Sequence, residues 1–154
     1  MRKILLTNLV FFLLISCGFA PIYSEKKKVD FYIESISFNN SDPELTNFIK
    51  INLNNYFLDN NEKNFNIEAS IDYNKNSISK DSKGNIEEYE ISANSTFEIY
   101  HDKFNTIIQF NEVIIMKNFA DEFEQIQYER NIKKTIARLI SSRLLMQLST
   151  INAN

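Results

Sequence analysis

Residues that build reactive sites are scarce in this chain of 154 residues. It contains one cysteine, one histidine, two glycines, two prolines and no tryptophan. A zinc site needs several ligands at suitable spacing, which one histidine and one cysteine do not supply. Gly18 and Gly84 are too far apart in sequence to form a glycine-rich phosphate loop. We therefore expect no metal and no cofactor.

A hydrolytic site is equally unsupported. His101 lies beside Asp102 in a predicted turn and would need a serine partner, but the chain has no nucleophile-elbow sequence. We interpret His101 as an exposed turn residue. Acidic pairs such as Glu87-Glu88 lie in predicted loops, where solvation explains them. We therefore predict no catalytic residues and no enzyme activity.

Basic residues are outnumbered, since 17 Lys and Arg stand against 20 Asp and Glu and the net charge is -3. A nucleic-acid-binding domain is usually basic, so we expect no nucleic acid partner. Apolar residues nonetheless make up 44% of the chain and include 13 Phe and 7 Tyr. At this length they can fill the core of one ordinary domain, but not of two.

The amino terminus has the pattern of a secretory signal. Arg2 and Lys3 precede a run over residues 4–15 that is apolar except for Thr7 and Asn8. A membrane-spanning helix needs about 20 apolar residues, and this run is shorter. A positive start, a short apolar run and the small Ser16 together predict a signal peptide over residues 1–16.

The single cysteine follows this signal directly. Leu14-Ile15-Ser16-Cys17 fits the lipobox of bacterial lipoproteins, in which the chain is cut between Ser16 and Cys17 and the cysteine receives a diacylglyceryl group and an amide-linked acyl chain. The alternative is an ordinary signal with an incidental cysteine near the cut. Two or more acyl chains give stable membrane anchoring. We predict that residues 17–28 form a lipidated amino terminus and tether, and that this lipid is the only non-protein group.

The residue after the cysteine bears on location. Among such lipoproteins an Asp at this position signals retention in the inner membrane, and here the position is Gly18. We therefore expect attachment to the outer membrane on its periplasmic side.

The remaining residues, 29–150, predict one α+β domain. Apolar residues alternate with polar ones where strands are expected and recur at helical spacing where helices are expected. The first strand changes phase between Ile33 and Ile36, which is consistent with a β-bulge. The expected elements are a strand at 29–38, a helix starting at the capping sequence Ser41-Asp42-Pro43-Glu44 and running to 57, strands at 65–73, 89–99 and 106–116, and a helix at 121–148.

The order strand, helix, three strands, helix fixes the expected architecture. Both helices have one apolar stripe and the strands have one apolar face, so both helices should pack on one face of a four-stranded mixed or antiparallel sheet. The first two strands should pair parallel, because a helix connects them. Residues 74–88 are polar and predict a long mobile loop. The run at 106–116 is apolar at consecutive positions and predicts a strand covered on both faces.

One cluster of charge could bind a ligand or partner. Arg130, Lys133, Lys134 and Arg138 lie close together in the last helix, on the side that we expect to be opposite Ile132, Ile136 and Ile140. Such a stripe could meet the phosphates of an anionic lipid or an acidic partner. The alternative is a solvated face in the carboxyl-terminal half of a helix.

Two short sequences carry a family resemblance. Cys17, Gly18, Phe19, Pro21 and Tyr23 form the pattern C-G-F-x-P-x-Y, which resembles the mature start of the lipopolysaccharide-assembly lipoproteins, the LptE family. The stretch Ile140-Ser141-Ser142-Arg143-Leu144 is similar to that family's I-x-x-R-L ending. The order of predicted elements agrees over the whole mature chain.

This resemblance implies a function. Members of the family sit inside the lumen of a large outer-membrane β-barrel, LptD, as plug and assembly factor while lipopolysaccharide is delivered to the outer leaflet. LptD and lipopolysaccharide are thus the implied partners. The alternatives are a structural lipoprotein of another envelope complex, such as a barrel-insertion accessory or a cell-wall-linked scaffold, and a periplasmic lipoprotein that binds a small ligand.

Overall fold

The computed structural model describes residues 31–57, 64–101 and 104–153. The elements follow in the order β1 (Tyr32–Asn39), α2 (Pro43–Leu53), the 3-10 helix η2 (Asn54–Tyr56), β2 (Asn64–Lys80), β3 (Ile86–His101), β4 (Phe104–Lys117) and α3 (Glu122–Ala153). The predicted signal peptide, the Cys17 that we expect to be acylated and the predicted tether lie outside the described residues.

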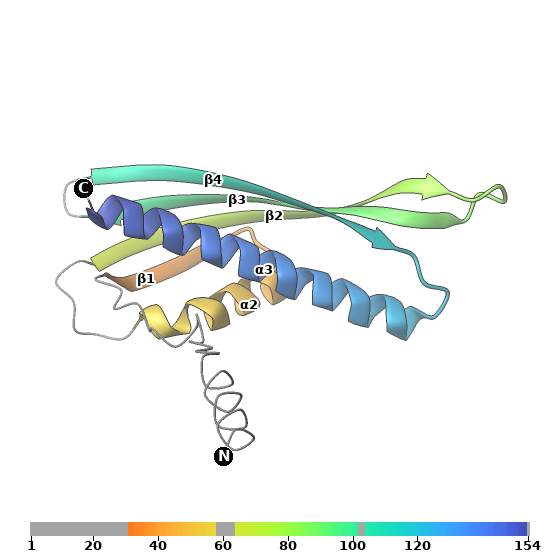
Figure 1. The fold of residues 1–154 in the computed structure, drawn as a ribbon, viewed down its shortest axis with the longest axis horizontal. Helices are drawn as coiled ribbons and strands as arrows, with labels where there is room; N and C mark the ends of the chain where they lie inside the picture. Colours follow the sequence, from red (N-terminus) through yellow and green to blue (C-terminus); the bar gives the residue numbers. More distant parts are fainter. Residues whose placement is uncertain (1–30, 58–63, 102–103, 154) are drawn as a thin grey trace, which may run out of the picture.

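The fold is the predicted α+β sandwich. The four strands are ordered β1-β2-β3-β4, with β1 parallel to β2 and the other neighbours antiparallel. Figure 1 shows α2 and α3 together on one side of this mixed sheet, and no described helix lies on the other side. The parallel pairing of β1 with β2 follows from the helical crossover between them, as expected. None of the described helices is long and apolar enough to cross a membrane.

Two local predictions at the start of the domain are confirmed. The register between β1 and β2 shifts between Ile33 and Ser35, which is the bulge expected from the change of phase. The helix α2 begins where the capping sequence lies, and the Asp42 carboxylate accepts the backbone N–H of Leu45 at 2.8 Å. Ser41 serves a different purpose, because its hydroxyl accepts the backbone N–H of Ile71 and so joins the loop to β2.

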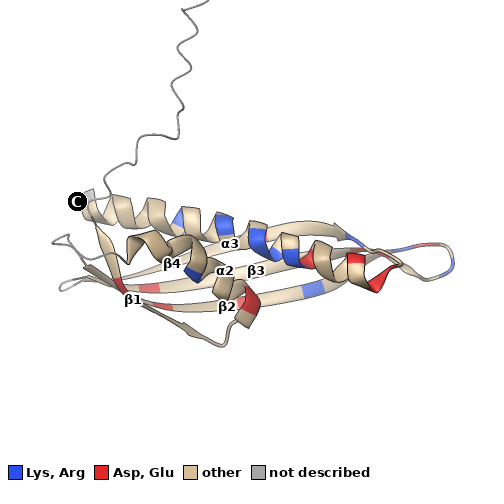
Figure 2. Cartoon of the chain, turned by 90° about the horizontal axis from the view of Figure 1, so that it is seen from below, with Lys and Arg blue, Asp and Glu red and all other residues tan. Residues whose placement is uncertain are grey.

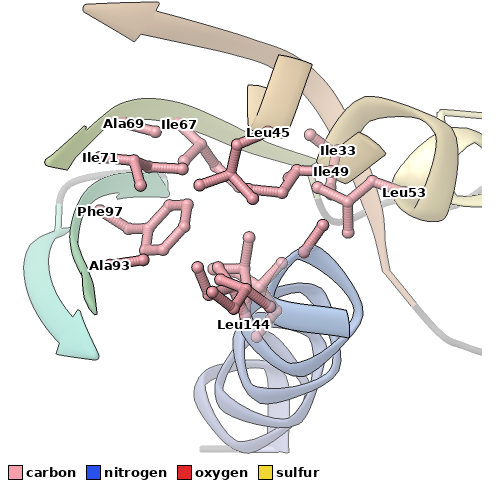
Figure 3. Packing of buried hydrophobic residues seen from close by; sticks show 14 of the residues in the cluster. Ile33, Leu45, Ile49, Leu53, Ile67, Ala69, Ile71, Ala93, Phe97 and Leu144 are labelled. Carbon is pink, nitrogen blue, oxygen red and sulfur yellow. The ribbon is translucent and has the colours of Figure 1, made fainter. Parts of the chain in front are cut away.

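The core lies between the two helices and the sheet. Figure 3 shows Leu45 and Ile49 of α2 and Leu144 of α3 directed at Phe97 and its neighbours on the sheet. Each of these side chains is fully buried, and such burial stabilises the fold by roughly 1.5–3 kcal/mol per side chain. The strands contribute the buried apolar residues Ile33, Phe65, Ile67, Ala69, Ile71, Ile91, Ala93, Phe97, Ile99 and Met116.

Two predictions about the strands are wrong. Residues 74–88 do not form a long mobile loop, because β2 and β3 continue as a paired ribbon as far as Lys80 and Ile86. Only a short turn closes the ribbon, with the Asp81 carboxylate accepting the backbone N–H groups of Lys83 and Asn85. Main-chain pairing needs no apolar side chains, so hydrophobic periodicity did not reveal these ends of the strands.

The second wrong prediction concerns β4. This strand is covered by the helices on one face only, since Ile107, Val113 and Ile115 point to the open side and are 60%, 49% and 48% exposed. The apolar run thus combines a buried face with an apolar face that the described part of the chain leaves uncovered.

Candidate functional site

The residues predicted for acylation and cleavage, Ser16 and Cys17, lie outside the described residues. So do the other residues of the amino-terminal motif, Gly18, Phe19, Pro21 and Tyr23. The site that the structure describes is the basic stripe of α3, which faces α2 across the surface of the sandwich. Figure 2 shows basic residues grouped along the middle of α3 and acidic residues near its amino-terminal end.

One half of the stripe is neutralised by α2. The Arg130 guanidinium Nε lies 3.0 Å from the Glu44 carboxylate. The Lys133 ammonium lies 2.8 Å from Asp42 and 3.5 Å from Glu44. These two basic residues therefore connect the middle of α3 to the amino-terminal turn of α2. Their role is to stabilise the packing of the two helices.

The expected placement of Lys133 opposite the apolar stripe is wrong. An α-helix turns by about 100° per residue, so Lys133 lies only about 20° around the axis from Ile140. Its side chain is 12% exposed and its ammonium lies 4.7 Å from the centre of the Tyr73 ring. The ion pairs with α2 compensate the charge of Lys133 at this partly buried position. A projection of α3 alone does not contain these contacts.

Two carboxylates near this half of the stripe, Asp42 and Glu129, have lowered pKa values. Burial alone would raise the pKa of Asp42, but the hydrogen bonds from Lys133 and from the Leu45 amide outweigh it and lower the pKa. The pKa of Glu129 is lowered for the same reason, because the effect of burial is outweighed by hydrogen bonds donated by Lys75 at 2.6 Å and Tyr73 at 2.9 Å. Both groups are held as carboxylates.

The Tyr73 hydroxyl completes this network. Burial raises the pKa of Tyr73, and the hydrogen bond that it donates to the Glu129 carboxylate raises it further. The phenol therefore stays protonated and joins β2 to α3. The network has a structural role and offers no reactive nucleophile.

The other half of the stripe borders a groove between the helices. Lys134 and Arg138 form no ion pair with any other described residue, in contrast to Arg130 and Lys133. The groove has a volume of about 470 Å³. It is lined by Phe48, Ile51 and Asn52 of α2 and by Lys134, Thr135 and Arg138 of α3.

The groove combines positive charge with apolar surface. The Lys134 ammonium lies 5.7 Å from the centre of the Phe48 ring, and Ile51 is 61% exposed beside it. Two cations next to apolar side chains match a ligand that has an anionic group joined to an apolar body. Sequence reasoning found the two cations but missed Phe48 and Ile51, because α2 and α3 meet only in the tertiary structure.

His101 is not the exposed turn residue that we expected. It is the last residue of β3, its ring centre lies 4.6 Å from that of Phe65, and its Nδ1 lies 3.0 Å from the Asn64 carbonyl oxygen. Its position at the end of the sheet explains the difference, because β3 extends further than the alternation indicated. Among the described residues no group of His, Cys, Asp and Glu side chains is placed to hold a metal ion.

A further ion pair involves the carboxyl-terminal motif. The Arg143 guanidinium lies 2.9 Å from Glu112 on the helix-covered face of β4, and the Glu112 side chain is only 8% exposed. The arginine of the I-x-x-R-L pattern thus compensates a buried charge. The sequence did not reveal this partner, because 31 residues separate the two positions.

These features define a small α+β sandwich with an amphiphilic groove between its helices. The sandwich fold is found among bacterial lipoproteins. A scan against protein-family models and a search of curated proteins gave no match. The fold is similar to that of rare lipoprotein B from Shewanella oneidensis, with a TM-score of 0.61 and 16% identity over 80% of this chain and 97% of that chain.

Two other lipoproteins share the fold. For a minor lipoprotein from Acinetobacter baumannii the TM-score is 0.53 at 12% identity, covering 77% of this chain and 94% of that one. For lipoprotein B from Nitrosomonas europaea it is 0.57 at 10% identity, covering 81% and 85%. At these identities the likeness concerns the fold.

Proposed function

We propose that the chain is an outer-membrane lipoprotein that is anchored on the periplasmic side through an acylated Cys17. In this proposal it acts as plug and assembly factor of a large outer-membrane β-barrel of the LptD kind during lipopolysaccharide transport. Residues 1–16 are removed as a signal peptide. The domain binds and positions partners and is not an enzyme.

The fold shared with rare lipoprotein B carries the lipoprotein part of the proposal, because the likeness extends over 97% of that chain. The pattern C-G-F-x-P-x-Y at the predicted acylation site is independent support from the sequence. The open face of the sheet suits a plug as well. It is rich in Asn, Ser, Thr and Glu, and the lumen of an outer-membrane barrel is polar.

The groove supports lipopolysaccharide as a second partner. Lipopolysaccharide joins phosphates to acyl chains, which is the combination of charge and apolar surface that Lys134, Arg138, Phe48 and Ile51 would meet. Because Lys134 and Arg138 have no acidic partner among the described residues, binding a phosphate would not require breaking an ion pair there.

The decisive experiment is purification of the tagged full-length chain in mild detergent. We expect a large, heat-modifiable β-barrel to purify with it, and mass analysis to find a fatty-acyl adduct on Cys17. If other envelope complexes survive and no barrel appears, the scaffold alternative replaces this proposal. If residues 1–16 are still attached, the anchoring is wrong.

Anchor and barrel contacts should act together, because each raises the effective concentration of the other partner. We expect a chain exported without the acyl group, through Cys17→Ser and a non-lipoprotein signal, to capture the barrel more weakly but still detectably. Unchanged capture would refute this coupling.

The groove is tested with charge reversal. We expect Lys134→Glu together with Arg138→Glu to reduce the lipopolysaccharide that purifies with the chain about tenfold. Lys80→Glu with Lys83→Glu at the exposed hairpin turn is the matched control, because it changes the net charge equally. Equal losses in both variants would mean that overall charge, and not the groove, attracts the lipid.

A further inference from the structure

The free edge of β4 has few of the features that usually protect an edge strand. Because the order is β1-β2-β3-β4, the outer strands are β1 and β4. Sheets usually protect their edges with short strands, bulges, prolines or lysines. The strand β1 has 8 residues, a bulge and the charged Glu34 at that bulge. The strand β4 has 14 residues, an uninterrupted register, no proline, and Lys117 only as its last residue.

The hydrogen bonds show which backbone groups of β4 are free. The Asn118 N–H donates to the Glu87 carbonyl at 2.8 Å, just beyond the end of β4. In an antiparallel ladder, bonded and non-bonded positions alternate, so the even-numbered residues of β4 bond to β3. The odd-numbered residues therefore direct their N–H and C=O groups away from the sheet. Figure 1 shows no described helix or strand beyond this edge.

The same odd-numbered residues carry the apolar side chains of the open face. Ile107 is 60% exposed, Val113 is 49% exposed and Ile115 is 48% exposed. Between them lie Gln109 and Asn111, whose side-chain amides donate to Thr96 and Asn94 on β3. The edge thus offers a polar centre flanked by apolar residues, together with free main-chain donors and acceptors.

We propose that β4 pairs antiparallel with β4 of a second copy of this chain. With a twofold axis at Phe110, Ile107 lies opposite Val113 of the other copy, and Gln109 lies opposite its Asn111. Apolar residues then meet apolar residues, and the amide row that begins at Asn94 continues across the joint. Such cross-strand pairs are the units that stabilise a sheet. The result is one continuous sheet with all helices on the same face.

Charge does not oppose this pairing. The only formal charge in the central part of β4 is Glu112, which Arg143 of the same chain compensates at 2.9 Å. At the proposed register Glu112 faces Ile108 of the other copy, so like charges are not brought opposite each other. The pairing uses only the edge of β4 and concerns copies that are not seated in a barrel lumen, so it does not depend on the proposed function.

Two differently tagged full-length copies, expressed together and purified through one tag in mild detergent, test the pairing. We expect the second tag to co-purify. Ile107→Lys in both copies should reduce the recovery about tenfold, because a charge then faces Val113. Adding Val113→Glu should restore recovery, since the introduced charges attract each other across the twofold axis. Ile126→Lys, at a similarly exposed position on α3 outside the groove, is the control.

Each outcome decides the proposal. Recovery that falls with Ile107→Lys, persists with Ile126→Lys and returns with Val113→Glu supports the pairing and its register. The proposal is overturned if the tags do not co-purify, if both lysine variants behave alike, or if Val113→Glu fails to restore recovery in a chain whose circular dichroism is unchanged. Co-purification of a barrel in the same eluate reports separately on the proposed function.

Discussion

The two faces of the sheet differ in the kind of residue that they carry. The face toward the helices carries fully buried residues such as Phe97 and Ile67. The open face carries residues such as Asn94 and Thr96, which bond to their neighbours on β4. The covered face therefore supplies most of the stability, whereas the open face is free to be selected for contacts with other molecules. The following experiments test that division.

The largest effect should come from the covered face. We expect Phe97→Ala to reduce the free energy of unfolding by about 3–5 kcal/mol, because it removes a fully buried ring and leaves a cavity. Thr96→Ala, one residue away on the open face, should cost about 0.5 kcal/mol or less. Urea unfolding of both variants measures the difference. Similar losses would show that the open face is part of the core.

The buried charge on the covered face gives the next effect. Arg143→Met should cost about 1–3 kcal/mol, because it leaves the Glu112 carboxylate buried without its partner. Adding Glu112→Leu should recover most of the loss. A double variant that is less stable than Arg143→Met alone would show that the ion pair is not what matters at this position.

Acid should weaken the contact between α3 and the rest of the domain. Folding lowers the pKa values of Asp42 and Glu129, so these groups stabilise the fold above their ordinary values of 3.8 and 4.5. That contribution is lost as the pH falls through the still lower folded values. We expect a smaller effect than for Arg143→Met, because both groups are partly exposed. Unfolding measured from pH 7 to pH 3 should show a shallower decline for Asp42→Asn with Glu129→Gln; an unchanged slope would exclude this origin.

The smallest effect should have the opposite sign. Glu68 and Glu98 are directly paired across β2 and β3 on the open face. Like charges at such positions repel, so Glu68→Gln should stabilise the domain by about 0.2–1 kcal/mol at low salt. Added salt should reduce the gain, since it screens exposed charges. Destabilisation would mean that Glu68 has a favourable contact on this face.

The sequence predicted the elements that have a strong apolar pattern. The order of strands and helices, the bulge after Ile33 and the start of α2 within the capping sequence at 41–44 are all confirmed, because each depends on neighbours along the chain. The helix α3 was placed at 121–148 and extends to Ala153. Its apolar stripe weakens near the end, which explains the shorter prediction.

The features that the sequence did not reveal depend on contacts between distant residues. The β2–β3 ribbon beyond Tyr73 is held by main-chain bonds between polar residues. The division of the basic stripe into a paired and an unpaired half follows from where Asp42 and Glu44 of α2 meet α3. A projection of α3 alone does not contain its contacts with α2. It therefore predicted the cations of the groove and not the residues of α2 that line it.

The β2–β3 ribbon makes the two ends of the molecule mechanically different. The described chain begins at Phe31, one residue before β1, and the first residue of β1 pairs with the first residue of β2. The Asp81 turn closes the far end of the ribbon. The 17 residues of β2 separate these points by about 56 Å. A tether at the amino terminus would therefore hold the molecule by one pole. The ribbon would then act as a lever arm, in which a small rotation at the tethered pole becomes a displacement of many ångströms at the tip.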